Sequence, residues 1–527
     1  MTQIHTLGEL RASGYRVRPV KDEMRANLLA KIARKETTFP GIHGYERTVV
    51  PAIHNAILSK HDIILLGLRG QAKTRILRSL TMLLDERVPV IEGCEINDSP
   101  LQPTCKHCRR LAAEQGDDLR IAWISREERY REKLATPDVT VADLIGDIDP
   151  IKAANQRLTY ADEEVIHYGI IPRTNRGIFA INELPDLAPR IQVALLNILE
   201  ERDLQIRGFP VRIPMDIVLV FSANPEDYTS RGNIITPLKD RIASQILTHY
   251  PQSVETARRI TEQEAWIERD AAVTVEIPAY VRDLVESIAF VARESELVDQ
   301  SSGVSARLTI AATELLQSNL ERRAALTGDR YVFPRLSDLS MILPAITGKV
   351  EMVYEGEQQG AEVVARKLIG QAVAKLFESK FPAVERAGVS ARSERGRGYG
   401  DIDADDLDDL FAGRRGKKKE APKEEPAPKP SAEPNYDTIL GWFASGNRVT
   451  VSDEQPFAEF FRDLNRVPKL AETASKYVQT TRDEERAFWM EMVLEGLHQA
   501  LRLAREDLDS TITFHELMKF NVLRTVK

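Results

Sequence analysis

The sequence predicts an α/β fold, in which a parallel sheet is flanked by helices, followed by a mainly helical region. Residues from about 36 to 250 alternate short apolar runs with helical patterns, which is the order found in βαβ sheets. From about 255 to 382 the strand-like runs disappear and helical patterns dominate. The 527-residue chain is also several times longer than one typical domain, so we expect more than one domain.

The composition is that of a globular protein and narrows the classes of function. Hydrophobic residues make up 43% of the chain and charged residues 29%, which excludes wholesale disorder. The net charge of −8 gives no global attraction for nucleic acid or an anionic membrane. No apolar run approaches the roughly 20 residues that span a bilayer, and three cysteines cannot form a disulfide framework. We therefore expect no membrane span, no nucleic-acid partner and a reducing, cytoplasmic location.

Four apolar runs are the expected strands of the sheet. They are short and bounded by polar residues, which is typical of strands that are buried on both faces. In chain order they are Asp62–Leu66, Val88–Ile91, Gly177–Ile181 and Ile217–Ser222. Open α/β sheets bind ligands at the carboxyl ends of their strands, so the polar residues that follow these runs are candidate site residues.

The strongest local signal is IILLGLRGQAKTRILRSL (Ile63–Leu80), in which an apolar strand leads into a glycine-containing loop and a helix. This is the context of a phosphate-binding P-loop, in which Lys73 could reach the β and γ oxygens of ATP and Thr74 could bind magnesium. The pattern G-x-x-x-x-G-K-[ST] is met except that Ala72 stands where the second glycine belongs. The predicted nucleotide-binding residues of this loop are Gly67, Gly70, Gln71, Ala72, Lys73 and Thr74.

Two further strand ends supply candidate catalytic residues. RGIFAINEL (Arg176–Leu184) ends in Asn182-Glu183, where a P-loop enzyme carries a magnesium-binding acid and a catalytic glutamate. Glu183 is the candidate general base for the water that attacks the γ-phosphate. Asn182 replaces the usual aspartate and lacks its charge, so we expect weaker magnesium binding or slower turnover. IVLVFSANPED (Ile217–Asp227) ends near Asn224, whose amide could hold this water or the γ-phosphate.

The order of these segments, completed by TPLKDR (Thr236–Arg241), resembles that of an AAA+ ATPase. More narrowly, the stretch Gly169–Gly232 is similar to magnesium chelatase I subunits and MoxR-type ATPases, and the resemblance extends over approximately residues 36 to 382. It implies that Leu204–Ile213 forms a β-hairpin before the sensor strand and that Asp147–Ile171 includes the insert into helix 2 of that clade. Both elements would point toward a central pore or a partner.

The resemblance also implies roles for three single residues. Asn224 looks like sensor 1, and Arg241 resembles the arginine finger that reaches ATP bound by the neighbouring subunit. Arg307, in GVSARLTIAATELL, resembles the sensor 2 arginine of a lid helix. A finger that acts across subunits requires a ring, so a homo-oligomer, expected to be a hexamer, is implied. The alternatives are a structural salt bridge for Arg241 and a surface position for Arg307.

The resulting domain plan has five parts. They are an N-terminal segment (1–35), the AAA+ nucleotide-binding domain (36–254), a helical lid domain (255–382), an acidic segment with a Lys/Glu/Pro-rich linker (383–435) and a separate C-terminal helical domain (436–527). The last part holds eleven of the 33 aromatic residues in helix-like periodicity. Its longest helical pattern runs from Arg482 to Asp507.

All three cysteines lie within fifteen residues, in GCEINDSPLQPTCKHC. Cys105 and Cys108 have the Cys-x-x-Cys spacing of half a zinc site, and Cys94 could supply a third thiolate. The fourth ligand is open, and Asp98, His107, a more distant histidine or water are the candidates. A redox-sensitive pair and ordinary reduced cysteines are the alternatives to zinc or another structural metal.

These observations predict a cytoplasmic, ring-forming ATPase that uses ATP and magnesium to remodel a partner protein. The resemblance implies a partner with a von Willebrand A domain, and metal insertion or the maturation of a metalloenzyme as a typical task. A true magnesium chelatase subunit and a weakly hydrolysing, ATP-gated scaffold are the alternatives, and Ala72 and Asn182 favour the latter. An ATPase that acts on a sigma factor is disfavoured, because no GAFTGA-like segment lies between Cys108 and Arg176.

Overall fold

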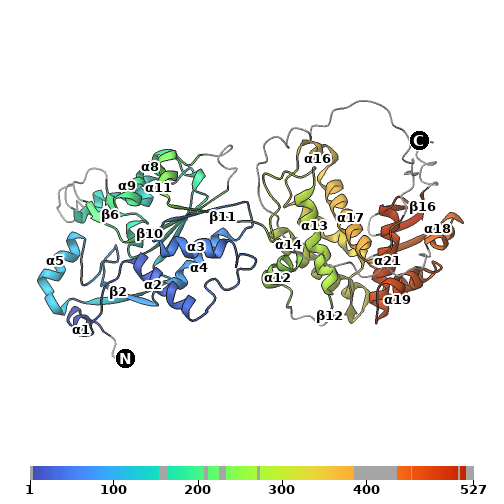
Figure 1. The fold of residues 1–527 in the computed structure, drawn as a ribbon, viewed down its shortest axis with the longest axis horizontal. Helices are drawn as coiled ribbons and strands as arrows, with labels where there is room; N and C mark the ends of the chain where they lie inside the picture. Colours follow the sequence, from blue (N-terminus) through green and yellow to red (C-terminus); the bar gives the residue numbers. More distant parts are fainter. Residues whose placement is uncertain are drawn as a thin grey trace, which may run out of the picture. The chain divides into compact units, whose positions relative to one another are not determined.

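The chain forms two compact units in the computed structural model (Figure 1). The structure describes residues 4–152, 163–206, 212–224, 233–269, 273–384, 436–452, 454–508 and 511–517. Unit 1 comprises Met1–Ile267, Val285–Thr313 and Pro344–Ala361, and unit 2 comprises Glu268–Leu284, Glu314–Leu343 and Glu362–Lys527. The predicted lid region, 255–382, is therefore divided between the two units. Residues 385–435, nearly all of the predicted acidic segment and linker, lie outside the described residues.

The core of unit 1 is a five-stranded parallel sheet in the strand order β11-β1-β10-β7-β4. Its strands are β1 (Ile63–Leu66), β4 (Tyr130–Leu134), β7 (Gly177–Asn182), β10 (Ile217–Ala223) and β11 (Ser244–Leu247). This confirms the predicted parallel sheet, and β1, β7 and β10 occupy the predicted positions.

The predicted strand Val88–Ile91 does not belong to this sheet. It forms most of β2 (Arg87–Ile91), which pairs antiparallel with β3 (Ile121–Ser125). The edge of the parallel sheet beside β7 is formed by β4. An apolar run predicts an extended segment but not its pairing partner. Here β2 and β3 form a separate two-stranded sheet, although 29 residues lie between them in sequence. That intervening segment carries α5 (Lys106–Gln115) and all three cysteines.

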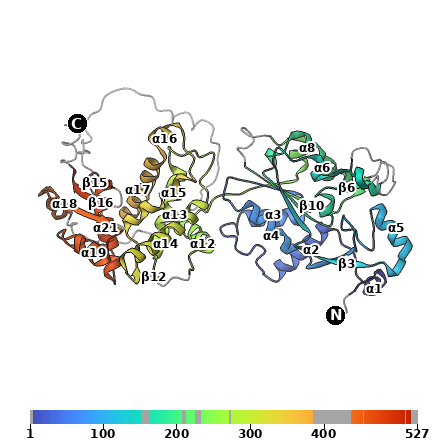
Figure 2. The ribbon, with the colours of Figure 1, turned by 180° about the vertical axis from the view of Figure 1, so that it is seen from behind.

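Side chains of the central sheet alternate between two apolar cores, one on each face. Ile63 and Leu65 pack with helices of one face, namely α2 (Val20–Ala33), α3 (Val49–Leu58) and α4 (Lys73–Ser79). Ile64 and Phe221 pack with helices of the other face, namely α8 (Pro189–Ala194), α9 (Leu196–Glu200) and α11 (Thr236–Arg241). Figures 1 and 2 show these two groups of helices on opposite sides of β10. Burial on both faces explains why β1, β7 and β10 are almost continuously apolar in sequence.

Unit 1 also contains two short antiparallel strand pairs at positions that the family resemblance implied. β8 (Asp203–Gln205) pairs with β9 (Arg212–Pro214), at the site of the expected hairpin. β5 (Gly146–Ile148) pairs with β6 (Ile166–Tyr168) at the two ends of the expected insert. Of that insert, residues 153–162 lie outside the described part of the chain.

Unit 1 contains further helices. They are α1 (Leu7–Ala12), α6 (Val141–Leu144), α12 (Val254–Glu264) and α16 (Tyr354–Gln359), with the 3-10 helices η1 (Leu80–Leu83), η2 (Gly116–Asp118), η3 (Glu163–Val165), η4 (Pro172–Thr174) and η5 (Leu184–Asp186). Some described helices contain residues of both units, among them α13 (Ala279–Glu294), α14 (Arg307–Thr327) and α15 (Leu343–Thr347). Within the described ranges, no helix is both long and apolar enough to cross a membrane.

Unit 2 combines helices with two small sheets. The helices are α17 (Ala361–Lys380), α18 (Tyr436–Ala444), α19 (Phe457–Asn465), α20 (Leu470–Tyr477), α21 (Asp483–Gln499) and the 3-10 helix η6 (Leu336–Ile342). A parallel pair joins β12 (Thr274–Val275) to β13 (Tyr331–Val332). An antiparallel sheet has the order β14-β16-β15, formed by β14 (Val449–Ser452), β16 (Thr511–Glu516) and β15 (Leu503–Leu508).

The antiparallel sheet is an addition to the expected C-terminal helices. The helical pattern from Arg482 onward ends at Gln499, because Leu501 adopts a left-handed backbone conformation with φ 58°. The chain then enters β15, whose sequence LAREDL consists largely of good helix formers. Pairing with β16 overrides that local propensity, so the sequence pattern alone could not place the boundary.

A buried polar network in unit 2 joins the predicted lid to the predicted C-terminal domain. The Glu491 carboxylate of α21 accepts hydrogen bonds from the backbone N–H groups of Leu336 (2.6 Å) and Ser337 (3.0 Å) at the start of η6. Arg335 donates to the carbonyl oxygen of Ser452 at 2.7 Å. These contacts lie inside one compact unit. Parts of the predicted lid and the predicted C-terminal domain therefore pack together.

Candidate functional site

The P-loop connects β1 to α4, and Ala72 lies immediately before that helix. Ala72 has φ 57° and ψ 17°, a left-handed conformation that glycine adopts without strain. A non-glycine residue in this conformation costs about 1–3 kcal/mol, and such strain persists only where the surroundings hold it. Ala72 therefore keeps the backbone conformation that the missing second glycine of the motif would supply.

Gly67 and Gly70 are required by the close approach of neighbouring segments. A Cβ atom at Gly67 would lie 1.9 Å from Oγ1 of Thr248, the residue that follows β11. A Cβ atom at Gly70 would lie 2.1 Å from Oγ of Ser305, which precedes α14. Larger residues at these two positions would displace the loop, so both predicted glycines shape the site.

The Lys73 ammonium group lies where the loop meets the end of β10. Its Nζ donates to the carbonyl oxygens of Gly67 and Leu68, the latter at 3.0 Å, and to Oδ1 of Asn224 at 2.8 Å. The side chain is only 7% exposed. The structure thus brings the predicted sensor residue Asn224 into direct contact with the P-loop lysine.

The end of β7 reaches the same place. Oδ1 of Asn182 accepts hydrogen bonds from Oγ1 of Thr74 (3.4 Å) and from Oγ of Ser222 (3.1 Å). The two predicted magnesium ligands, Thr74 and Asn182, are therefore neighbours. Glu183 follows with φ 55°, and its backbone N–H donates to Ser222 at 3.4 Å. A strained backbone at a residue facing a cavity is a frequent property of functional sites.

One cavity of about 830 Å³ in unit 1 is lined by most of the predicted site residues, although not by Gly67 or Asn182. This volume lies within the usual range for small-molecule sites. The predicted site residues that line it are Gly70, Gln71, Ala72, Lys73, Thr74, Glu183, Asn224 and Arg307. The three strand and loop ends that the sequence singled out therefore face one ligand-sized space.

One wall of the cavity was not predicted from the sequence. The Tyr45 hydroxyl donates to the carbonyl oxygens of Gln71 (3.0 Å) and His249 (2.7 Å), and burial raises the pKa of Tyr45 to about 12. The Tyr45 and His249 rings meet edge to face with 4.9 Å between their centroids. These residues lie on loops without a recognisable motif, so the sequence held no signal for them.

Two further arginines, Arg75 and Arg78, line the cavity, and each forms an ion pair with an acid. Burial would raise the pKa of Glu264, but hydrogen bonds from Gln263 and Arg75 lower it. A hydrogen bond from Arg78 lowers the pKa of Glu132. Both acids are therefore ionised at neutral pH and hold the arginines in place beside the P-loop.

The two predicted catalytic arginines lie in different surroundings. Arg307 is the first residue of α14 and lines the cavity. Arg241, at the end of α11, is not among the described residues that line it. Its guanidinium donates to Glu200 at 2.7 Å and to the carbonyl oxygen of Pro237 at 3.0 Å. The structure brings Arg307 to the P-loop of its own subunit and leaves Arg241 in an ion pair away from it.

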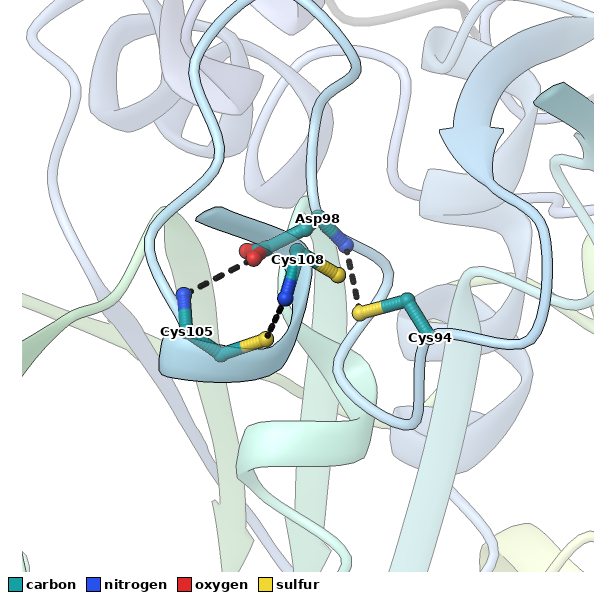
Figure 3. Close-up of side chains that lie close together, drawn as sticks. All are labelled: Cys94, Asp98, Cys105 and Cys108. Carbon is teal, nitrogen blue, oxygen red and sulfur yellow. Dashed lines mark hydrogen bonds between the residues drawn. The ribbon is translucent and has the colours of Figure 1, made fainter. Parts of the chain in front are cut away.

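The cysteines form a second cluster in unit 1 (Figure 3). The sulfur atoms of Cys94, Cys105 and Cys108 and a carboxylate oxygen of Asp98 all lie within 4.8 Å of one another. All three cysteines are free thiols. His107 is exposed, and its Nδ1 contacts Arg110 at 3.4 Å. Among the candidates for a fourth ligand, the fold therefore brings Asp98 to the cysteines.

The thiols of this cluster interact with one another. Hydrogen bonds with Cys105 and Cys108 lower the pKa of Cys94 far below its ordinary value, although burial opposes this shift. Hydrogen bonds with the other two cysteines raise the pKa of Cys108. The cluster thus favours a single thiolate, on Cys94, when no cation is bound.

Comparison with known proteins relates part of this chain to a known family. Residues 120–242 match the family model of the AAA domain of the dynein-related subfamily. The magnesium-chelatase 67 kDa subunit of Heliobacterium mobile is 26% identical over 202 residues. Residues 120–242 therefore belong to an AAA domain, and the chain is similar to a magnesium chelatase subunit. The match to the Heliobacterium subunit covers 37% of this chain and 29% of that subunit, so it spans less than a third of that relative.

Solved structures of other AAA+ proteins are more distant. A magnesium chelatase complex of the subunits BchI and BchD is 20% identical, covering 61% of this chain and 98% of the matched one, with a TM-score of 0.31. Hsp104 in its closed state is 13% identical, covering 60% and 50%, with a TM-score of 0.35. These likenesses are too weak to add to the assignment of the AAA+ domain.

Proposed function

We propose that this chain is an ATPase that works as a ring of identical subunits and couples ATP hydrolysis to the remodelling of a partner protein. The observation that carries the proposal is the convergence of three segments on one cavity. Lys73 contacts Asn224 from β10, and Thr74 contacts Asn182 from β7. This arrangement is the one that phosphoryl transfer requires, because positioning and electrostatic stabilisation supply most of its catalysis.

The residues of the cavity fit ATP. Gly67 and Gly70 let Thr248 and Ser305 approach the loop closely. Successive loop N–H groups form an anion-binding concavity in proteins of this kind. Lys73, Arg75, Arg78 and Arg307 provide positive charge for a triphosphate. Bound phosphate would replace the neutral carbonyl acceptors of Lys73 by charged ones, which form stronger hydrogen bonds.

Each residue of the site then has a task in hydrolysis. Glu183 accepts a proton from water while the water oxygen bonds to the γ-phosphorus and the bond between that phosphorus and the ADP oxygen breaks. Lys73 stabilises the negative charge of the transferred group, and Asn224 orients the lysine or the water. Thr74 and Asn182 would hold magnesium, which when bound neutralises charge on the phosphates.

The ring and the partner are the finer parts of the proposal. Arg241 lies outside the cavity of its own subunit, which is the position expected for an arginine that completes a neighbour's site. The family resemblance supports a hexamer in the cytoplasm and a client with a von Willebrand A domain, with metal insertion or metalloenzyme maturation as the task. The Heliobacterium relative keeps a magnesium chelatase role as the alternative.

Asn182 favours a second candidate, an ATP-gated scaffold that hydrolyses slowly. Its amide oxygen carries no full charge, so magnesium would be held less firmly than by an aspartate. In such a scaffold, ATP binding would close a ring that recruits its partner, and turnover would only reset it.

Steady-state ATP hydrolysis, measured together with the oligomer mass with and without ATP and magnesium, separates these possibilities. We expect Glu183→Gln to abolish hydrolysis while ATP still binds, and Lys73→Ala to abolish ATP binding in calorimetry. A ring that forms with ATP but shows no hydrolysis in the unmodified chain would favour the scaffold. Unchanged ATP affinity in Lys73→Ala would overturn the proposal altogether.

A further inference from the structure

The cysteine cluster has the donor set and the spacing of a structural zinc site. We propose that Cys94, Asp98, Cys105 and Cys108 bind one zinc ion in tetrahedral geometry, with Asp98 as the fourth ligand. Zinc–sulfur distances of about 2.3 Å place the ligand atoms of a tetrahedral site about 3.8 Å apart. The four ligand atoms already lie within 4.8 Å of one another, so small side-chain movements would close the site.

The cluster also contains a carboxylate that is buried beside an apolar core. The carboxylate of Asp98 is 0% exposed, and a buried charge is costly unless it is paired or coordinates a metal. Thr104 and Cys105 donate their backbone N–H groups to Oδ2 of Asp98 at 2.9 and 2.8 Å, and the Thr104 hydroxyl donates to Oδ1. Carboxylates that bind metals are typically oriented by such hydrogen bonds. These contacts are therefore compatible with Asp98 as a ligand, because they hold its carboxylate in a fixed orientation.

Backbone N–H groups also point at the sulfur atoms, as Figure 3 shows. The N–H of Asp98 donates to the sulfur of Cys94 at 3.3 Å, and the N–H of Cys108 donates to the sulfur of Cys105 at 3.3 Å. Donors in these positions stabilise negative charge on sulfur, and the thiolate is the form that binds metal.

The position of the site indicates what the zinc ion would do. The ligands come from the turn after β2 and from the start of α5, so one ion would fasten the two ends of this loop. The N–H of Lys106 in α5 donates to Glu163 at 2.8 Å, next to β6 of the family insert. Cys105 and Cys108 belong to the same apolar core as Val165. Zinc would therefore hold α5 in place under the base of that insert.

Zinc content measured by mass spectrometry on the full chain, purified under reducing conditions without added metal, tests the proposal directly. We expect one zinc per chain, a loss to less than a tenth of that in Cys105→Ser/Cys108→Ser, and full retention in His107→Ala. His107 lies between the two cysteines and outside the cluster, so it is the matched control. For Asp98→Asn we expect at least tenfold weaker zinc binding in competition with a chelator.

Cobalt substitution keeps the test valid if the cysteine variant does not fold. The unmodified chain, stripped of metal and loaded with cobalt, should show thiolate-to-cobalt charge transfer and the visible bands of a tetrahedral ion. A folded chain without zinc and without these bands would overturn the proposal. A disulfide between Cys105 and Cys108 in freshly purified protein would also overturn it, as would unchanged zinc affinity in Asp98→Asn. None of these readouts depends on ATP hydrolysis.

Discussion

At the scale of single residues, the two departures from the P-loop ATPase pattern have different consequences. Ala72 changes the chemistry of the loop little, because it adopts the left-handed conformation of the glycine that it replaces. Asn182 changes the charge of the site, because an amide stands where a carboxylate usually helps to hold magnesium. The rate of hydrolysis is therefore expected to depend on Asn182 rather than on Ala72.

Asn182→Asp should restore that charge without disturbing the packing. Oδ1 of Asn182 accepts from the hydroxyls of Thr74 and Ser222, and an aspartate oxygen can accept both bonds equally well. We expect the half-saturating magnesium concentration for ATP hydrolysis to fall about tenfold, which corresponds to about 1.4 kcal/mol. Titration of magnesium in a steady-state assay measures this change.

Asn224→Asp is the contrasting variant, because it places a carboxylate at the other strand end. There it would pair with Lys73, whose ammonium contacts Asn224 at 2.8 Å, and ATP binding should weaken. An identical magnesium dependence in Asn182→Asp and the unmodified chain would show that Asn182 does not face the ion.

The residues with a motif were accessible from the sequence, and those without one were not. Lys73, Thr74 and Glu183 follow apolar strands, so their common location at one edge of the sheet could be predicted. Tyr45 and His249 reach the same cavity from loops, and only the folded chain reveals this. Asp98 is intermediate, since the sequence offered it as one of four candidate ligands.

At the level of helices and strands, the predictions failed where hydrogen bonding between strands, rather than the local sequence pattern, determines the secondary structure. Val88–Ile91 has the composition of a central strand but pairs with β3 in a separate ribbon. Leu503–Leu508 has helix-forming residues but is a strand, because β16 offers it a partner. In contrast, β1, β7 and β10 are buried on both faces, and their continuous apolar runs made them predictable.

Glu491 makes the contact between α21 and η6 sensitive to pH. Burial raises its pKa to about 7, from 4.5, although two backbone N–H groups and Arg335 favour the ionised form. The folded state therefore binds the proton more tightly than the unfolded state. The stabilisation from this group is complete below about pH 4.5 and is lost as the pH rises through about 7.

Glu491→Gln should remove this dependence. In this variant we expect the free energy of unfolding of unit 2 to fall less between pH 5 and pH 7.5 than it does in the unmodified chain. The difference should correspond to the loss of about one titrating group. Denaturant unfolding at both pH values measures the difference. Glu459→Gln, an exposed acid on α19, is the control and should keep the original slope. Equal slopes in all three proteins would contradict the assignment.

At the level of the whole molecule, the least predictable feature was that unit 2 combines part of the predicted lid with the predicted C-terminal domain. The linker of Lys, Glu and Pro predicts a boundary between domains, and the described residues on its two sides nevertheless pack together. Arg335, which precedes the linker in sequence, donates to the carbonyl oxygens of Ser452 and Gln455, which follow it. Contacts over such sequence distances leave no local trace in the residues that make them.

The same scale decides whether Arg241 acts across subunits. Arg241→Ala should preserve ATP binding and abolish hydrolysis, and Glu183→Gln should do the same for a different reason. In a ring that mixes both variants equally, a complete site forms wherever an Arg241→Ala subunit is followed by the intact arginine of a Glu183→Gln subunit. We therefore expect about a quarter of the unmodified activity, measured on co-expressed subunits carrying two different purification tags.

Glu200→Ala tells this role from a structural one. It breaks the ion pair that Arg241 forms with Glu200 at 2.7 Å but leaves the arginine in place. If Arg241 completes a neighbour's site, Glu200→Ala should retain hydrolysis and Arg241→Ala should not. If the ion pair merely stabilises α11 against α9, both variants should lose stability and activity together, and the mixed ring should remain inactive. The mixed ring and the Glu200 variant are thus two independent tests of the same claim. Only an arginine that reaches another subunit predicts both an active mixed ring and an active Glu200→Ala variant.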